Sequence, residues 1–189
     1  DDDFERLIAA AELAEQASNE PRERREQAQN ITQPCWLGVV DIDHFKKIND
    51  NFGHLFGDEV LLRVADLMRQ SFRNNDKLFR FGGEEFVVML RNVAEDHVQN
   101  IFNRFRADVE KHDFPRVGRV ACSLGFARID PRLSPAELLG RADEALYYSK
   151  NNGRNQANGF DELIMSGKLR INTPAGQAQI QSDIDEIFL

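Results

Sequence analysis

The stretch RFGGEEFVVML, residues 80–90, combines two features that constrain the fold. Gly82 and Gly83 interrupt an otherwise apolar run, and Glu84 and Glu85 follow them directly. Paired glycines between two β-forming runs are typical of a hairpin turn, because glycine adopts positive φ without a steric cost. The sequence therefore predicts strands over KLFRF and EFVVML, joined at the glycines, with two carboxylates at the turn.

The segments around this hairpin alternate between strand and helix patterns. CWLGVVDI is a buried-strand pattern that ends near Asp41, RVACSLGFARI is a second one, and a short strand is expected after GRNQANGF. Amphipathic helices are predicted over about 58–72, 95–111 and 134–150, the last opened by a Ser-Pro pair suited to an N-cap. We therefore expect an α+β fold with helices packed on a central mixed, mainly antiparallel sheet.

Composition divides the chain into three parts. Residues 1–33 are expected to form an N-terminal helix and a mobile polar loop, 34–160 a compact domain, and 161–189 a C-terminal tail. The chain opens on DDDFER without a methionine, which is expected of a piece cut from a longer protein.

Charge and cysteine usage limit the partners and the compartment. The net charge of -8 over 189 residues argues against general binding to nucleic acid or to an anionic membrane. Cys35 and Cys122 form no C-x-x-C pair, which favours reduced thiols in a cytoplasmic location. No apolar stretch approaches the roughly 20 residues that cross a bilayer. A membrane attachment would have to come from a part upstream of this chain.

The carboxylates predict a cation site. If the strand that ends in DID lies beside the hairpin, several like charges meet at one end of the sheet, and oxygen ligands of this kind suit Mg²⁺ or Mn²⁺. Gly82 and Gly83 would also let backbone N–H groups approach a phosphate. The alternatives are ordinary ones: a plain hairpin turn with exposed glutamates, and a DID that caps the next helix.

Three longer motifs occur in a fixed order: DIDHFKKINDNFGHLFGDEV, RFGGEEF and RADEALYYSKNNGRN. Together they resemble the bacterial diguanylate cyclase family, named GGDEF after its hairpin, over about residues 36–158, with the Glu variant at position 84. The resemblance implies a signalling nucleotidyltransferase that makes cyclic di-GMP from two GTP with loss of two pyrophosphates. It also implies a fold similar to nucleotide cyclase and polymerase palm domains.

The resemblance implies roles for the acidic residues. Asp41, Glu84 and the backbone carbonyl of Ile42 would ligate the metal ions, and Glu85 would sit beside them and assist deprotonation of the attacking 3′-hydroxyl. Asp43 is interpreted as structural, as is the histidine at position 54. Each domain would hold one GTP, so the resemblance implies that a homodimer of catalytic domains is needed for turnover.

Substrate contacts follow from the same resemblance. Phosphate contacts are expected from Lys46, Lys150 and Arg154, for which the alternative is a solvated surface charge. Guanine recognition is expected from Asn49 and Asp58, since a carboxylate offers acceptors to the guanine N1–H and amino group. Asp58 has a second interpretation, as the N-cap of the following helix.

A regulatory site is the last expectation. RNND, residues 73–76, matches the family's inhibitory R-x-x-D pattern, and Arg104 corresponds to an arginine that completes this site, so Arg73, Asp76 and Arg104 would bind cyclic di-GMP. The alternative is a helix-terminal Arg and a turn Asp. A non-catalytic cyclic di-GMP receptor and cyclisation within one GTP are the competing functions. The family's L-T-x-L-x-N-R segment is absent from this sequence.

Overall fold

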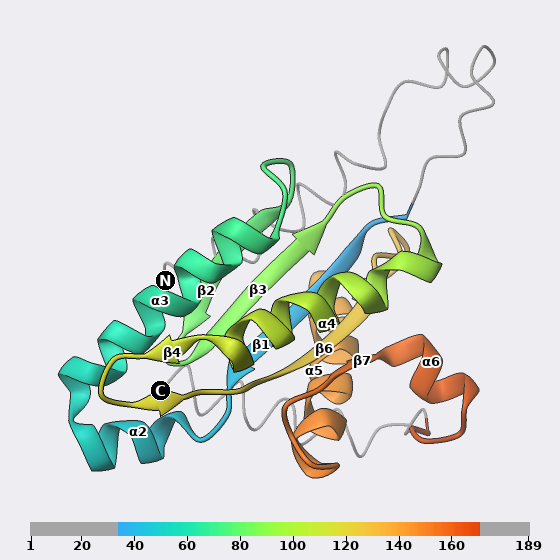
Figure 1. The fold of residues 1–189 in the computed structure, drawn as a ribbon. Helices are drawn as coiled ribbons and strands as arrows, with labels where there is room; N and C mark the ends of the chain where they lie inside the picture. Colours follow the sequence, from blue (N-terminus) through green and yellow to red (C-terminus); the bar gives the residue numbers. More distant parts are fainter. Residues whose placement is uncertain (1–33, 171–189) are drawn as a thin grey trace.

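The computed structural model describes residues 34–170, which form one central sheet covered by helices on both faces (Figure 1). The helix and loop predicted over 1–33, and positions 171–189 of the predicted tail, lie outside the described residues. The elements in chain order are β1 (Trp36–Ile42), α2 (Phe45–Phe52), α3 (His54–Ser71), β2 (Lys77–Gly82), β3 (Glu85–Leu90), α4 (Glu95–Lys111), β4 (Asp113–Phe114), β5 (Gly118–Arg119), β6 (Cys122–Arg128), α5 (Pro135–Asn151), β7 (Ala157–Gly159) and α6 (Phe160–Met165).

The main sheet has the strand order β2-β3-β1-β6-β7. β1 lies in its centre, antiparallel to β3 and β6; β2 is antiparallel to β3, and only β7 runs parallel to its neighbour β6. All of β1 is buried, because helices cover both faces of the sheet. The predicted α+β fold with a mixed, mainly antiparallel sheet is confirmed, and the predicted hairpin is the β2–β3 pair.

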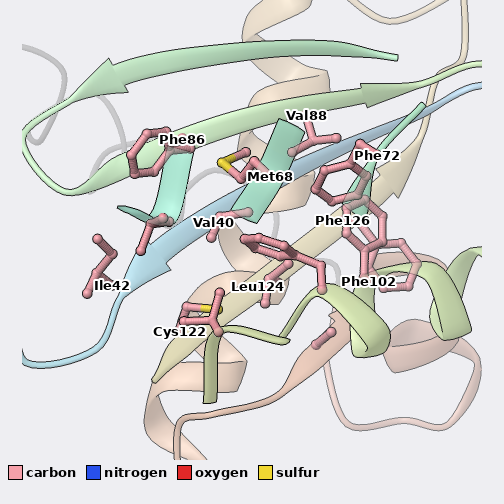
Figure 2. Close-up of a cluster of buried hydrophobic side chains, with 14 of the residues drawn as sticks. Val40, Ile42, Met68, Phe72, Phe86, Val88, Phe102, Cys122, Leu124 and Phe126 are labelled. Atoms are coloured by element: carbon pink, nitrogen blue, oxygen red, sulfur yellow. The ribbon is translucent and has the colours of Figure 1, made fainter. Parts of the chain in front are cut away.

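One face of the sheet packs against α3 and α4 (Figure 2). Phe102 of α4 stacks on Phe126 of β6 with ring centroids 4.9 Å apart. A Cβ at Gly38 would lie 2.5 Å from the Phe102 ring, so only glycine allows this close approach of α4 to β1. The cluster fixes the sheet beneath the helices that carry the site.

The other face packs against α5 and α6. A Cβ at Gly125 would lie 2.1 Å from the Leu146 backbone nitrogen, so a glycine in β6 lets the backbone of α5 sit directly on the sheet. Ser134 is the N-cap of α5, as the Ser-Pro pair indicated, and it also forms a full capping box with Glu137. Leu163 of α6 is buried in the same cluster, so the folded part of the chain continues past residue 160, the last position of the predicted domain.

Three elements differ from the sequence predictions. α2 was not predicted, because it buries only Phe45 and Ile48 and is too short to show a helical period. α3 begins at His54, earlier than the predicted start at 58, because Gly53, at φ 87°, separates it from α2. The strand predicted over 119–129 begins at Cys122, since Arg119 pairs with Asp113 in a separate two-stranded sheet.

Within 34–170, no helix combines the length and the apolar character that crossing a membrane requires.

Candidate active site

The β2–β3 turn depends on the backbone conformation of its two glycines. Gly83 has φ 47°, in the left-handed region, and no atom within 4 Å would meet a Cβ at Gly82 or Gly83, so backbone conformation rather than space requires glycine there. The Arg80 guanidinium donates two hydrogen bonds, of 2.8 and 3.3 Å, to the Gly83 carbonyl oxygen. The turn is therefore fixed and presents an uncovered backbone beside Glu84 and Glu85.

The predicted convergence of acids is found beside this turn. Asp41, next to the last residue of β1, is the register partner of Glu85 in β3. The Ile42 N–H donates to the Glu84 carbonyl oxygen at 3.4 Å. Asp41 is buried and Glu85 half-buried. Burial raises the pKa of both carboxyls, and each is raised further by the charges of neighbouring acids, Glu84 among them. The negative charge of these carboxylates is therefore poorly solvated at this site.

One cation compensates this charge. The Lys150 Nζ, from α5, lies 2.7 Å from Oδ2 of Asp41 and opposes the rise in the pKa of that carboxyl. Lys150 was predicted as a phosphate contact. In the structure its ammonium group is paired with Asp41, the predicted metal ligand. One residue was missed by the sequence analysis: burial, together with the charge of Glu85, raises the pKa of Asp143 to about 7. The sequence does contain a signal for Asp143: it lies two helical turns before Lys150, which places both residues on one face of α5.

Asp43 holds the backbone next to the acids through hydrogen bonds, which agrees with the structural role predicted for it. Its carboxylate accepts hydrogen bonds from the Ser123 hydroxyl at 2.8 Å and from the Asn155 N–H at 2.9 Å. The Arg154 Nε lies 4.0 Å from Asp43 Oδ1. Arg154, a predicted phosphate contact, is therefore held near the end of β1, with its side chain partly exposed.

The predicted guanine-binding residues lie where α2 meets α3. Oδ1 of Asn49 is buried and has no hydrogen-bond partner among the described residues, which leaves one polar acceptor unsatisfied. A Cβ at Gly57 would lie 2.0 Å from that oxygen, so Gly57 makes the room that Asn49 occupies. The N-cap of α3 is Gly53, so the interpretation of Asp58 as an N-cap is wrong and its exposed carboxylate is free of that role.

A cavity borders one of these two residues, Asp58. Asp58 lines one of about 530 Å³ between α3 and the β2–β3 hairpin, together with Leu61, Arg80 and Phe86. It combines apolar walls with one carboxylate and the guanidinium groups of Arg69 and Arg80, as small-molecule sites commonly do. Lys46, on α2, is exposed and lies in the same turn of that helix as Asn49.

The predicted regulatory residues lie at the other end of the hairpin. The buried carboxylate of Asp76 accepts hydrogen bonds from the Arg73 N–H at 2.9 Å and the Arg91 N–H at 3.3 Å, so it stabilises the turn before β2. Arg104 of α4 donates to the Ser71 carbonyl oxygen at 3.0 Å, which brings it beside the same turn. Arg73 is exposed there. The structural alternative for Asp76 is thus present, and because its carboxylate bonds to backbone N–H groups it uses neither guanidinium group.

The acids fit a hard divalent cation only together with a substrate. Among residues 34–170, no group of three or more His, Cys, Asp or Glu side chains is placed to hold a metal ion. Mg²⁺, however, is usually bound through one or two carboxylates plus substrate phosphates. Asp41 and the neighbouring hairpin acids supply such a partial set, in surroundings that disfavour uncompensated charge.

The family of the chain follows from its match to known proteins. The family model described as "Diguanylate cyclase, GGDEF domain" matches residues 10–156. This chain therefore belongs to the GGDEF domain family. It is 41% identical over 123 residues to diguanylate cyclase DgcP of Pseudomonas aeruginosa and 42% identical over 122 residues to diguanylate cyclase A of Treponema denticola. These matches cover 64% and 62% of this chain but only 18% and 33% of the relatives, so the chain spans about a fifth to a third of their length.

Solved structures agree with this assignment. The active GGEEF domain of a diguanylate cyclase from Vibrio cholerae is similar with a TM-score of 0.68 and 30% identity, covering 82% of this chain and 95% of that one. The GGDEF domain of DgcB from Caulobacter crescentus, solved in complex with c-di-GMP, is similar with a TM-score of 0.65 and 34% identity, covering 74% and 85%. The expected fold of this family is thus confirmed.

Proposed function

We propose that this chain is the catalytic domain of a diguanylate cyclase, which condenses two GTP into cyclic di-GMP and releases two pyrophosphates. The observation that carries the proposal is the acid pair of buried Asp41 and half-buried Glu85, placed opposite each other on neighbouring strands at a glycine hairpin, with Lys150 paired to Asp41. Burial opposes the charge of such a constellation, so a binding or catalytic role explains it better than stabilisation of the fold. Membership of the GGDEF family and the named cyclases among its relatives support the same activity.

The metal proposal uses this chain's own oxygen ligands. Asp41, Glu84 and the Ile42 carbonyl would hold Mg²⁺ or Mn²⁺. When bound, such an ion neutralises charge on the triphosphate and eases ionisation of the attacking hydroxyl. Lys150 has two possible anionic partners, Asp41 and the triphosphate, and supplies positive charge to the site in either position.

The nucleotide would lie across the end of the sheet between α2, α3 and the hairpin. Lys46, Lys150 and Arg154 would contact its phosphates, and the backbone at Gly82 and Gly83 would approach them without obstruction. Asn49 and Asp58 would read the guanine. The unpaired Oδ1 of Asn49 supports this, since guanine N–H groups would satisfy it.

The reaction itself follows from the placement of the acids. In each condensation the 3′-oxygen of one GTP forms a bond to the α-phosphorus of the other, the bond to the bridging oxygen of pyrophosphate breaks, and the hydroxyl proton passes to a base. Glu85 is our candidate for this base, because burial and the charge of Asp41 raise its pKa, which makes the carboxylate a stronger base. Both nucleotides must be held in line, so two domains of this chain would face each other as a homodimer.

Regulation and location complete the proposal. Arg73, Asp76 and Arg104 would bind the product and inhibit turnover, and the placement of Arg104 beside the turn at residues 73–76 supports this. The same observation favours the second candidate function, a cyclic di-GMP receptor without turnover. The enzyme is preferred because a receptor has no use for the acids at the hairpin. A cytoplasmic location follows from the proposed GTP substrate.

The test is to incubate the purified chain with GTP and Mg²⁺ and to identify the nucleotide product by mass spectrometry. Cyclic di-GMP with release of pyrophosphate supports the enzyme. Tight binding of added cyclic di-GMP without turnover of GTP would support the receptor, and a cyclic mononucleotide would support cyclisation within one GTP.

A further inference from the structure

The loop that follows α5 is held in a strained conformation. Gly153, Arg154 and Asn155 all have positive φ, of 114°, 60° and 47°, although two of them are not glycine. Residues with side chains adopt this region at a cost, and they remain there only where other contacts enforce it. The contacts that hold this loop should therefore be identifiable.

Two residues of α4, Arg106 and Glu110, hold the side chain of Asn155 in this loop. Arg106 Nη1 donates to Asn155 Oδ1 at 2.8 Å and to Glu110 Oε2 at 2.7 Å, and Asn155 Nδ2 donates to Glu110 Oε1 at 2.8 Å. Each of the three residues thus bonds to both others and forms a closed triangle. The bond from Arg106 lowers the pKa of Glu110, so the pair is charged at neutral pH.

The backbone of Asn155 connects this triangle to the candidate active site. Its N–H donates to Asp43 Oδ2 at 2.9 Å, while Asp43 Oδ1 accepts from Ser123 and lies 4.0 Å from the Arg154 Nε. Asp43 directly follows Asp41 and Ile42 in the chain. One residue therefore links α4, the guanidinium proposed to bind phosphate and the backbone beside the acid pair.

We propose that Asn155, clamped by Arg106 and Glu110, is a positioning residue for the nucleotide site, which sets the orientation of Arg154 and of the β1 end through Asp43. The inference rests on the proposed function, because Arg154 matters to catalysis only if a triphosphate binds there. Neither Arg106 nor Asn155 touches the substrate in this proposal. The side chains of Arg106 and Glu110 are 20% and 41% exposed and belong to neither apolar cluster, so the main effect of the triangle should fall on the loop rather than on the fold.

The first test removes the clamp but keeps the loop conformation. Asn155→Gly loses both side-chain contacts, while glycine tolerates φ 47° and keeps the N–H that bonds Asp43. We expect the Kd of the full chain for a non-hydrolysable GTP analogue, and its KM for GTP, to rise roughly tenfold, as when one charge-assisted contact is weakened. Arg106→Ala should have a similar effect alone and little added effect in the Asn155→Gly background, because both act on one contact. Lys111→Ala, an equal charge change at an exposed position of α4, is the matched control.

The second test is a rescue that a general loss of stability would not produce. Asn155→Asp keeps the acceptor for Arg106 but faces Glu110 with a second carboxylate, so it should weaken analogue binding at least as much as Asn155→Gly. Adding Glu110→Gln places an amide donor opposite the new carboxylate, which reverses the direction of the original hydrogen bond. We expect the double variant to return to within about threefold of the wild-type Kd.

The outcomes separate the inference from the function on which it rests. If the wild-type chain makes cyclic di-GMP and Asn155→Gly binds the analogue as the wild type does, the positioning role is overturned and the proposed function stands. Failure of Glu110→Gln to rescue Asn155→Asp also counts against the clamp. A wild-type chain that neither binds nor converts GTP overturns both.

Discussion

The Nζ of Lys150 lies 2.7 Å from Oδ2 of Asp41, so the proposed phosphate contact and the proposed metal ligand form an ion pair across the interface between α5 and β1. Lys150 opposes the burial that raises the pKa of Asp41. The carboxylate of Asp41 is thus paired with a cation before any ligand arrives. The same lysine would have to serve the triphosphate, which links substrate binding to the ionisation of the acid.

Lys150→Ala should therefore change both affinity and pH dependence. Without the ammonium group the pKa of Asp41 rises further, and the ionised carboxylate needed for metal binding appears only at higher pH. We expect the acidic limb of the kcat/KM profile to move to higher pH and the KM for GTP to rise by about tenfold or more. Lys150→Arg, which keeps the charge, is the control and should restore the position of the limb. An unchanged limb in Lys150→Ala would separate Asp41 from the activity.

The hairpin acids should be essential for product formation. Glu85→Gln keeps the shape of the side chain but removes the candidate base, and we expect kcat to fall by about 10²–10⁴-fold. Glu84→Ala should abolish turnover through loss of the proposed metal ligand. Both variants should fold, because neither side chain belongs to the apolar core. Cyclic di-GMP formation and the circular dichroism spectrum are the measurements, with Glu162→Gln at an exposed site of α6 as the control. Full activity in Glu85→Gln would remove the role assigned to this residue.

Asp143 should make the fold less stable at higher pH. Its pKa is raised from 3.8 in the unfolded chain to about 7 in the folded one, so the folded state retains a proton that the unfolded state has lost. The contribution is fully favourable below pH 3.8, declines as pH rises, and is lost once pH passes about 7. Asp143→Asn removes this dependence, so its free energy of unfolding relative to wild type should be higher at about pH 8 than at about pH 5. Urea denaturation at the two pH values measures it. A wild-type stability that rises across this range in step with the variant would contradict the assignment.

The close packing of α5 on the sheet should depend on glycine in β6. In Gly125→Ala the added methyl group would meet the Leu146 nitrogen at 2.1 Å and the Ala142 carbonyl oxygen at 2.2 Å, both of them backbone atoms that cannot rotate away. We expect a loss of about 1–3 kcal/mol or more in the free energy of unfolding. Asn100→Ala, at an exposed position of α4, is the control and should change stability little. A shift in the chemical denaturation midpoint is the measurement, and a midpoint equal to wild type would show that α5 moves without cost.

The sequence predicted the hairpin, because a local pattern decides it, whereas the place of the hairpin beside β1 was only a condition of the predicted cation site. The glycines require a turn, and the apolar runs on either side can only be buried as neighbouring strands. The contacts between distant residues followed from no local pattern. Lys150 and Asp143 reach the acids only because α5 crosses β1 and β6, and Asn49 meets Gly57 only because α2 turns back on α3. The part of the site that arises from tertiary packing therefore required the structure.

The predicted regulatory site provides the last test. Arg73 is exposed at the turn that Asp76 stabilises, and Arg104 lies beside it, so Arg73→Ala removes a guanidinium without disturbing the bonds to the Asp76 carboxylate, which come from backbone N–H groups. We expect cyclic di-GMP to bind at least tenfold more weakly and the initial rate to persist at product concentrations that inhibit the wild type. Calorimetric titration and progress curves with added product measure the two effects. Lys77→Ala, which removes an exposed positive charge at the start of β2, should leave both unchanged. Inhibition that persists in Arg73→Ala, together with unaltered product affinity, would place the regulatory site elsewhere.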